Sequence, residues 1–330
     1  ALCGYGNQID ISVDEDNNTI EVQDYGRGVP FGIRENGENV LVSIYSKSHT
    51  GGKFEEGAYK NVSGLNGIGA KCVCLSSNDF VVESCRDGQM AKAIFFKGDL
   101  IDYHECPTKH ANGTLIRFSP DPEVFKDEPI HYSFQRICED IKNISYLYSG
   151  ITFNLYDIKT GTRITHCAKN GIIDFVKDNL KDPIHPHIIH ETITDGTDKL
   201  EIAFQWGSKH ETSYVFVNGL RCPEGGSPIT GAKMAITRTF NTLTGETYDG
   251  ELIRANLFYV INCSVAQPSF ANQTKTKINN ANLRAMASTA FSNALKMMEK
   301  AYRDEFATVA NLVKRVTKAD AAAEKARKQA

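Results

Sequence analysis

The glycine-rich segment at residues 59–69 constrains the fold more than any other part of the sequence. It reads Tyr-Lys-Asn-Val-Ser-Gly-Leu-Asn-Gly-Ile-Gly and leads into an expected short helix at 70–75. Glycines free backbone amides to face an anion, and a helix amino terminus adds its dipole, so this segment suits a polyphosphate. No Lys-Ser or Lys-Thr pair follows the last glycine, and no strand leads into the segment. These two facts exclude a Walker loop and a Rossmann fingerprint. Taken alone, the glycines also fit a flexible loop.

Apolar periodicity predicts strands and helices around this segment. Alternation at 9–13 and 20–22, with a turn between them, predicts a hairpin. In the first half we expect further strands at 80–84, 91–96, 114–118 and 151–156, and helices at 39–48, 133–148 and 172–180. In the second half we expect strands at 200–206, 213–218 and 257–263, and helices at 231–240, 283–298 and 306–316, with a helix-forming end at 321–330. Prolines at 183 and 186 predict a domain junction between the two halves.

The composition narrows the class of protein. Hydrophobic residues make up 41% of the 330 residues, enough for two cores, and the net charge of −3 gives no global sign of nucleic-acid binding. No apolar run approaches the roughly 20 residues of a membrane span, so we expect no membrane partner. The nine cysteines show no paired zinc spacing. We therefore interpret them as reduced thiols of a cytoplasmic protein.

Two further short motifs have the chemistry of a nucleotide site. The first is Asp24-Tyr25-Gly26-Arg27-Gly28, at the end of the predicted hairpin. Its carboxylate can accept a hydrogen bond from the amino group of adenine, and its glycines allow the backbone to approach the base. The second is Gly113-Thr114, where a hydroxyl could join Asp24, directly or through water. Alone, the first motif also fits an ordinary turn, and the second is common.

A fourth motif lies far along the chain. The segment 269–277 reads Ser-Phe-Ala-Asn-Gln-Thr-Lys-Thr-Lys. Lys275 is a compact point charge suited to a terminal phosphate. Outside this context it would be a solvated loop lysine.

The order of these motifs resembles the nucleotide site shared by gyrase, Hsp90, histidine kinases and MutL. Within that superfamily, the segment 49–54 (His-Thr-Gly-Gly-Lys-Phe), the lid at 59–69, the Gly225-Gly226 loop and the Gln273-Thr274-Lys275 segment resemble the gyrase B family, which includes the corresponding topoisomerase IV proteins. The resemblance covers essentially the whole chain. It implies an α/β sandwich, with a mixed and mostly antiparallel sheet and helices on one face, over residues 1–182. A smaller α/β transducer domain would follow over 183–300, and a connecting helix over 301–330.

The resemblance also implies the ligands and the residues that bind them. We expect ATP and Mg²⁺, with adenine at Asp24 and Thr114, and Lys275 as the catalytic residue that reaches the terminal phosphate. The full set of expected nucleotide-binding residues is Asp24, Gly26, Gly28, Pro30, Lys53, Tyr59, Gly64, Leu65, Asn66, Gly67, Ile68, Gly69, Ala70, Thr114, Gln273 and Lys275. The implied partners are double-stranded DNA, a second copy of the chain, and a DNA-cleaving subunit of the gyrase A or topoisomerase IV kind.

One family feature is not found in the sequence. In the family, a helix just upstream of the position of Ala1 carries a general-base Glu and, one turn later, a magnesium-binding Asn. We therefore expect no metal ligand in the chain itself, and negligible ATP hydrolysis by residues 1–330 alone. Two alternatives remain at this point: a nucleotide-binding dimerisation module without turnover, and a MutL-like ATPase. Supercoiling and relaxing enzymes are not distinguished.

Overall fold

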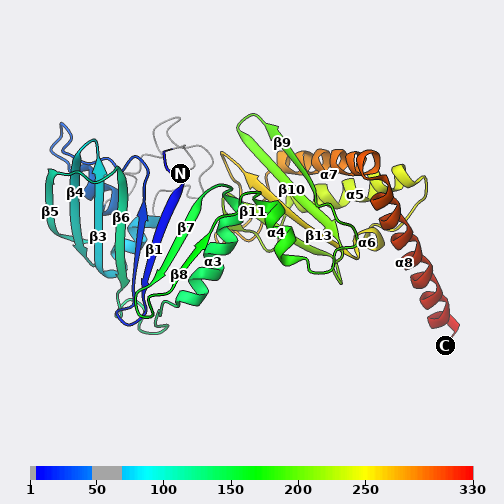
Figure 1. Cartoon of the computed structure of the whole chain (residues 1–330), viewed down its shortest axis with the longest axis horizontal. Helices are drawn as coiled ribbons and strands as arrows, with labels where there is room; N and C mark the ends of the chain where they lie inside the picture. The colour runs from blue at the N-terminus through cyan, green and yellow to red at the C-terminus, as the bar shows by residue number, and fades with distance from the viewer. Residues whose placement is uncertain (1–4, 47–68, 330) are drawn as a thin grey trace. The chain divides into compact units, whose positions relative to one another are not determined.

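The described residues form two compact units. The computed structural model describes residues 5–46 and 69–329 (Figure 1). One unit extends to Gly171, and the other begins at Ile172. The helix α4 (Ile172–Asn179) packs on the sheet of the second unit, through Phe175 against Tyr214, Phe216 and Phe258. The domain boundary at residues 182–183 stays a prediction.

The first unit is built on a mixed sheet. Its strands are β1 (Gln8–Asp14), β2 (Thr19–Asp24), β3 (Ser77–Arg86), β4 (Gln89–Phe96), β5 (Asp99–Pro107), β6 (Gly113–Pro120), β7 (Thr152–Asp157) and β8 (Arg163–His166). Their order is β5-β4-β3-β6-β2-β1-β7-β8. Among the described strands of this sheet, β1 and β7 form the parallel pair, and the other neighbours are antiparallel. The predicted mixed, mostly antiparallel sheet is confirmed.

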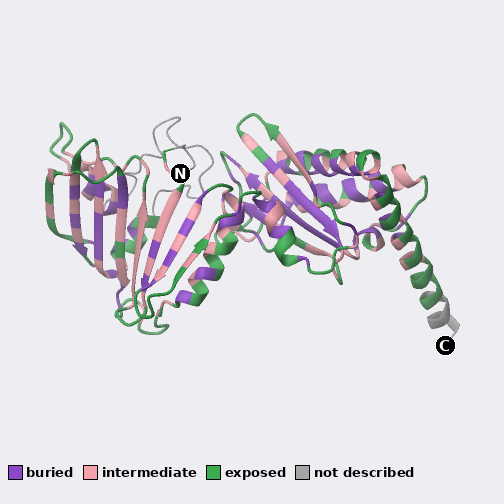
Figure 2. Ribbon diagram, viewed as in Figure 1, coloured by how far each residue is buried: buried purple, intermediate pink, exposed green. Residues whose placement is uncertain are grey.

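Helices cover one face of this sheet. They are α1 (Val40–Ser46), α2 (Gly69–Leu75) and α3 (Phe134–Leu147). The cross-strand partners Phe80, Phe118 and Ile20 lie on the same face because residues directly opposite in a sheet share a side. One end of this face packs on α1 and α2, and the other on α3, which gives the two apolar clusters of the unit. Figure 2 shows the resulting alternation of buried and less buried residues along the strands.

The second unit has a sheet covered on both faces. Its strands are β9 (Ile189–Asp195), β10 (Asp198–Trp206), β11 (Thr212–Val217), β12 (Leu220–Arg221) and β13 (Leu257–Ser264), in the order β12-β11-β13-β10-β9. The near-continuous burial of β10 and β13 follows from this double cover. The helices besides α4 are α5 (Ser227–Thr244), α6 (Gly250–Arg254), α7 (Ala281–Ala301) and α8 (Arg303–Gln329). Residues of α5 and α7 join the opposite face in one large core.

The start of α5 differs from the sequence prediction. We expected a helix from residue 231, but α5 begins at Ser227. Pro228 lies in its first turn, where its missing N–H costs no hydrogen bond and its fixed φ suits a helix. Residues 227–230, part of the segment whose glycine and proline suggest a loop from sequence, are therefore the first turn of the helix.

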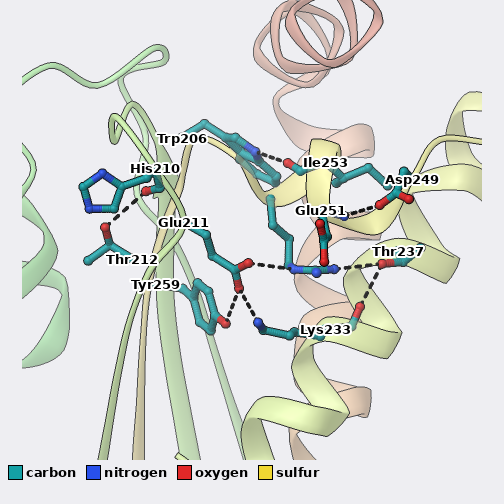
Figure 3. A network of polar contacts seen from close by, with 11 residues as sticks. Trp206, His210, Glu211, Thr212, Lys233, Thr237, Asp249, Glu251, Ile253 and Tyr259 are labelled. Carbon is teal, nitrogen blue, oxygen red and sulfur yellow. Dashed lines mark hydrogen bonds and ion pairs between the residues drawn. The ribbon is translucent and has the colours of Figure 1, made fainter. Parts of the chain in front are cut away.

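A polar network ties α5 and α6 to the sheet of the second unit (Figure 3). Glu211 lies at its centre and contacts Arg254 at 3.2 Å, Lys233 at 3.2 Å and Tyr259 at 2.9 Å. Arg254 also donates to the hydroxyl of Thr237 at 3.1 Å. Because the Arg254 side chain is only 8% exposed, its charge depends on Glu211 for compensation.

Two general features bear on the class of protein. Across the described residues, none of the helices has both the length and the apolar character needed to cross a membrane. Every cysteine in the described part of the chain is a free thiol.

Candidate nucleotide site

The register of the sheet brings Asp24 and Thr114 together. Asp24 ends β2, Thr114 is the second residue of β6, and the two are direct partners in the antiparallel pairing. Thr114 is also the register partner of Ser84 on β3. Thr114 and Ser84 are buried, and Asp24 is half-buried. The two residues proposed for one base therefore lie side by side, although they are distant in sequence.

The polar atoms of this pair are only partly used within the protein. Asp24 Oδ1 accepts a hydrogen bond from the backbone N–H of Gly26 at 2.7 Å. Among the described residues, Asp24 Oδ2 has no hydrogen-bond partner. Thr114 Oγ1 accepts from the N–H of Val29 at 3.1 Å, which leaves its own proton to donate. One carboxylate oxygen and one hydroxyl proton are thus available to a ligand.

Gly28 permits a close approach of two backbone segments beside this pair. Its φ is +76°, and a Cβ there would lie 2.4 Å from the carbonyl oxygen of Cys85. Ser84 Oγ donates to the carbonyl of Val29 at 2.7 Å, next to this contact. Ser84 was not among the residues predicted from sequence, and the signal that could have found it is its position opposite Thr114. Pro30, predicted as a site residue, is exposed.

An apolar cluster lies behind the Asp24–Thr114 pair. It includes Leu41 and Tyr45 of α1, Cys74 of α2, and Val29. Burial raises the pKa of Tyr45, and the negative charge of Asp24 raises it further. Burial likewise raises the pKa of the Cys74 thiol to about 12. These two groups beside Asp24 are therefore neutral.

The lid predicted from sequence is described only at its end. Lys53, Tyr59, Gly64, Leu65, Asn66, Gly67 and Ile68 lie outside the described residues. Gly69 and Ala70 are the first two residues of α2, and both are exposed. The helix expected directly after the glycines is confirmed.

Gln273 and Lys275 lie in the second unit, in a tight loop between residues 269 and 279, which we call the Lys275 loop. An antiparallel bridge between Phe270 and Ile278 closes it. Lys275 has a φ of +58°, a left-handed conformation that non-glycine residues rarely adopt. Its ammonium lies 5.8 Å from the centroid of the Phe270 ring. Gln273 is exposed.

Known proteins resemble this chain in sequence. The family model described as DNA gyrase B matches residues 171–329. The chain is 31% identical to the DNA gyrase B protein of Archaeoglobus fulgidus, over 91% of the chain and 49% of that protein. It is 32% identical to the DNA gyrase B protein of Staphylococcus aureus, over 88% of the chain and 48% of that protein. The chain thus spans about half the length of these relatives.

The fold is also similar to a solved structure. The 43K ATPase domain of Thermus thermophilus gyrase B, in complex with an aminocoumarin, matches all of this chain with a TM-score of 0.82 and 23% identity, and 88% of that domain is covered. At this identity the likeness shows the fold, and the relatives above add the sequence similarity. Together with the family model, these matches show that the chain belongs to the DNA gyrase B family.

Proposed function

We propose that the chain is the ATP-binding and transducer region of a type II DNA topoisomerase subunit. In this role it couples ATP binding and hydrolysis to DNA strand passage, with double-stranded DNA, a second copy of itself and a DNA-cleaving subunit as partners. Membership of the gyrase B family supports this function over a MutL-like ATPase. Magnesium would accompany the ATP.

The observation that carries the proposal is the Asp24–Thr114 pair. Asp24 Oδ2 would accept the exocyclic amino group of adenine, and the Thr114 hydroxyl would donate to a ring nitrogen or to a water beside it. The fixed approach at Gly28 keeps the backbone after Asp24 close to β3. Thr114 and its register partner Ser84 are buried, which would limit the access of water to that side of the pair. A purine base would bind here by one acceptor and one donor on adjacent strands.

The phosphates would be bound by two further segments. The backbone amides of residues 64–70 would face the phosphate chain, with Lys53, Tyr59 and the first turn of α2 nearby. Lys275 and Gln273 would approach from the second unit, and Lys275 would bind the terminal phosphate. ADP lacks that phosphate, so only a triphosphate would offer this lysine a contact.

Titration calorimetry with a non-hydrolysable ATP analogue tests the adenine contact. Asp24→Ala removes the acceptor, which costs about 1–3 kcal/mol, so we expect the affinity to fall about tenfold or more. ADP should lose the same factor because it carries the same base. Asp24→Asn is a second variant that keeps an acceptor for the N–H of Gly26, in case the alanine variant is locally unfolded.

Asp99→Asn is the matched control, because Asp99 is an exposed carboxylate at the start of β5 in the same unit. It should bind both nucleotides as the wild type does. Wild-type affinity in a folded Asp24→Ala protein would rule out the adenine assignment.

A further inference from the structure

The left-handed conformation of Lys275 must be maintained by its surroundings. A non-glycine residue with positive φ is strained relative to the common backbone regions. The strain persists only where neighbouring contacts determine the conformation. In the Lys275 loop, such contacts come from both sides of the lysine.

Asn272 holds the loop from within. Its carbonyl accepts from the N–H of Lys275 at 3.2 Å, and its side-chain oxygen accepts from the N–H of Thr276 at 3.1 Å. Its amide nitrogen donates to Thr276 Oγ1 at 2.7 Å. The residue after the lysine is therefore bound through both its backbone and its side chain.

The segment before α5 holds the loop from outside. The Thr276 hydroxyl donates to Glu224 Oε1, and the N–H of Glu224 donates to the carbonyl of Thr276 at 3.0 Å. The Cys222 thiol donates to the carbonyl of Lys275 at 3.3 Å. Gly226 continues the contact, because a Cβ there would lie 2.0 Å from the Ile278 carbonyl oxygen. Two segments distant in sequence thus run together at the lysine.

We propose that Glu224 is a positioning residue for Lys275, acting through the hydroxyl of Thr276. Glu224 accepts the proton of that hydroxyl and Asn272 donates to its oxygen, and together they fix the backbone from which the Lys275 side chain extends. The charge of Glu224 makes its contact stronger than a neutral hydrogen bond. This inference rests on the proposed contact of Lys275 with the terminal phosphate. Glu224 itself need not touch the nucleotide.

The test compares the affinities of the full-length protein for a non-hydrolysable ATP analogue and for ADP. Thr276→Val removes the hydroxyl at nearly constant shape, and we expect a three- to tenfold loss of analogue affinity, the size of one hydrogen bond (about 0.5–1.5 kcal/mol). ADP affinity should stay at the wild-type value. Glu224→Gln should act in the same direction with a smaller effect. Thr276→Ser keeps the hydroxyl and should restore binding of the analogue.

Lys275→Ala is measured in parallel so that two failures can be separated. If Lys275→Ala leaves analogue affinity unchanged, the proposed contact of Lys275 with the terminal phosphate is wrong. The role inferred for Glu224 is then wrong as well. If Lys275→Ala weakens the analogue while Thr276→Val and Glu224→Gln do not, this inference alone is overturned. Equal losses for ADP and the analogue in Thr276→Val would show a merely structural role. Glu299→Gln is the control and should change neither affinity. In the wild type, the Glu299 carboxylate on α7 contacts the exposed Arg303 on α8.

Discussion

The Asp24–Thr114 site and the Lys275 loop are held in place by different kinds of contact. Asp24 and Thr114 are positioned by the strand register and lie beside the fixed Gly28 backbone, next to a buried cluster. Lys275 is positioned by side-chain hydrogen bonds of Asn272, Glu224 and Thr276, none of which is buried. The proposed base site, built from the backbone, would therefore exist before a ligand binds. The hydrogen bonds that hold the Lys275 loop are exposed to water, so the loss of one should cost little folding free energy.

The largest effect on folding stability should come from the Glu211 network. Its contacts are more buried than the hydrogen bonds of the Lys275 loop. Glu211→Ala leaves Arg254 without its carboxylate, and Arg254 is largely buried. Removing one partner of a buried pair is strongly destabilising, and the partial exposure of Glu211 reduces the loss, so we expect about 3 kcal/mol. Urea denaturation followed by circular dichroism measures it. A loss below about 1 kcal/mol would show that burial does not make the Glu211 contacts more important for folding stability than the exposed contacts of the Lys275 loop.

The next largest effect should be on hydrolysis. In the full-length protein, Lys275→Ala should lower ATP turnover about 100-fold, as the loss of single electrostatic stabilisers does. ADP affinity should stay near the wild-type value because ADP has no terminal phosphate to contact. Association of two copies of the chain in the presence of the ATP analogue, followed by light scattering, should weaken in parallel. Undiminished phosphate release would show that Lys275 is a loop residue without a role at the phosphate.

Glycine substitutions test whether the backbone builds the base site. Gly28→Ala combines a positive φ with a Cβ 2.4 Å from a carbonyl oxygen, whereas Gly88 has a φ of +80° and open space around its Cβ position. We expect Gly88→Ala to cost about 1 kcal/mol for the left-handed conformation alone. Gly28→Ala should lower the free energy of unfolding by about 2 kcal/mol more than Gly88→Ala does. It should also weaken the binding of adenine nucleotides. If the two variants lost the same free energy of unfolding, the close approach of Gly28 to the Cys85 carbonyl would not contribute to the stability of the site.

The same contrast explains what could be predicted from the sequence. The hairpin β1–β2 carries apolar alternation, and the strands β3, β4 and β6 carry short apolar runs, because all of them contribute residues to the two apolar clusters of the unit. The edge strands β5 and β9 were not predicted. β5 is exposed along most of its length, and β9 has little buried surface, so neither has a clear period of two.

The site shows the same division. Asp24 and Thr114 belong to short motifs at strand ends, and their pairing follows once those strands are adjacent. Glu224 precedes a glycine pair that was noted, but its partner Thr276 lies in a loop much further along the chain. No local pattern encodes a contact between two irregular segments. The residues that position Lys275 therefore required the structure, whereas Lys275 itself was predicted by resemblance.

The smallest expected effect concerns folding stability, and it is the sharpest comparison of the two regions. Thr276→Val removes hydrogen bonds that are open to water, where solvent replaces a lost partner at little cost. The change in the free energy of unfolding should stay within about 0.5 kcal/mol, as is usual for surface substitutions. Urea denaturation of the wild type, Thr276→Val and Thr276→Ser measures it under identical conditions. The variant should thus fold as the wild type does and still discriminate less between the ATP analogue and ADP. A destabilisation above about 1.5 kcal/mol would show that the contacts of Thr276 contribute to folding stability, as those of Glu211 do, and would remove the contrast between the two regions.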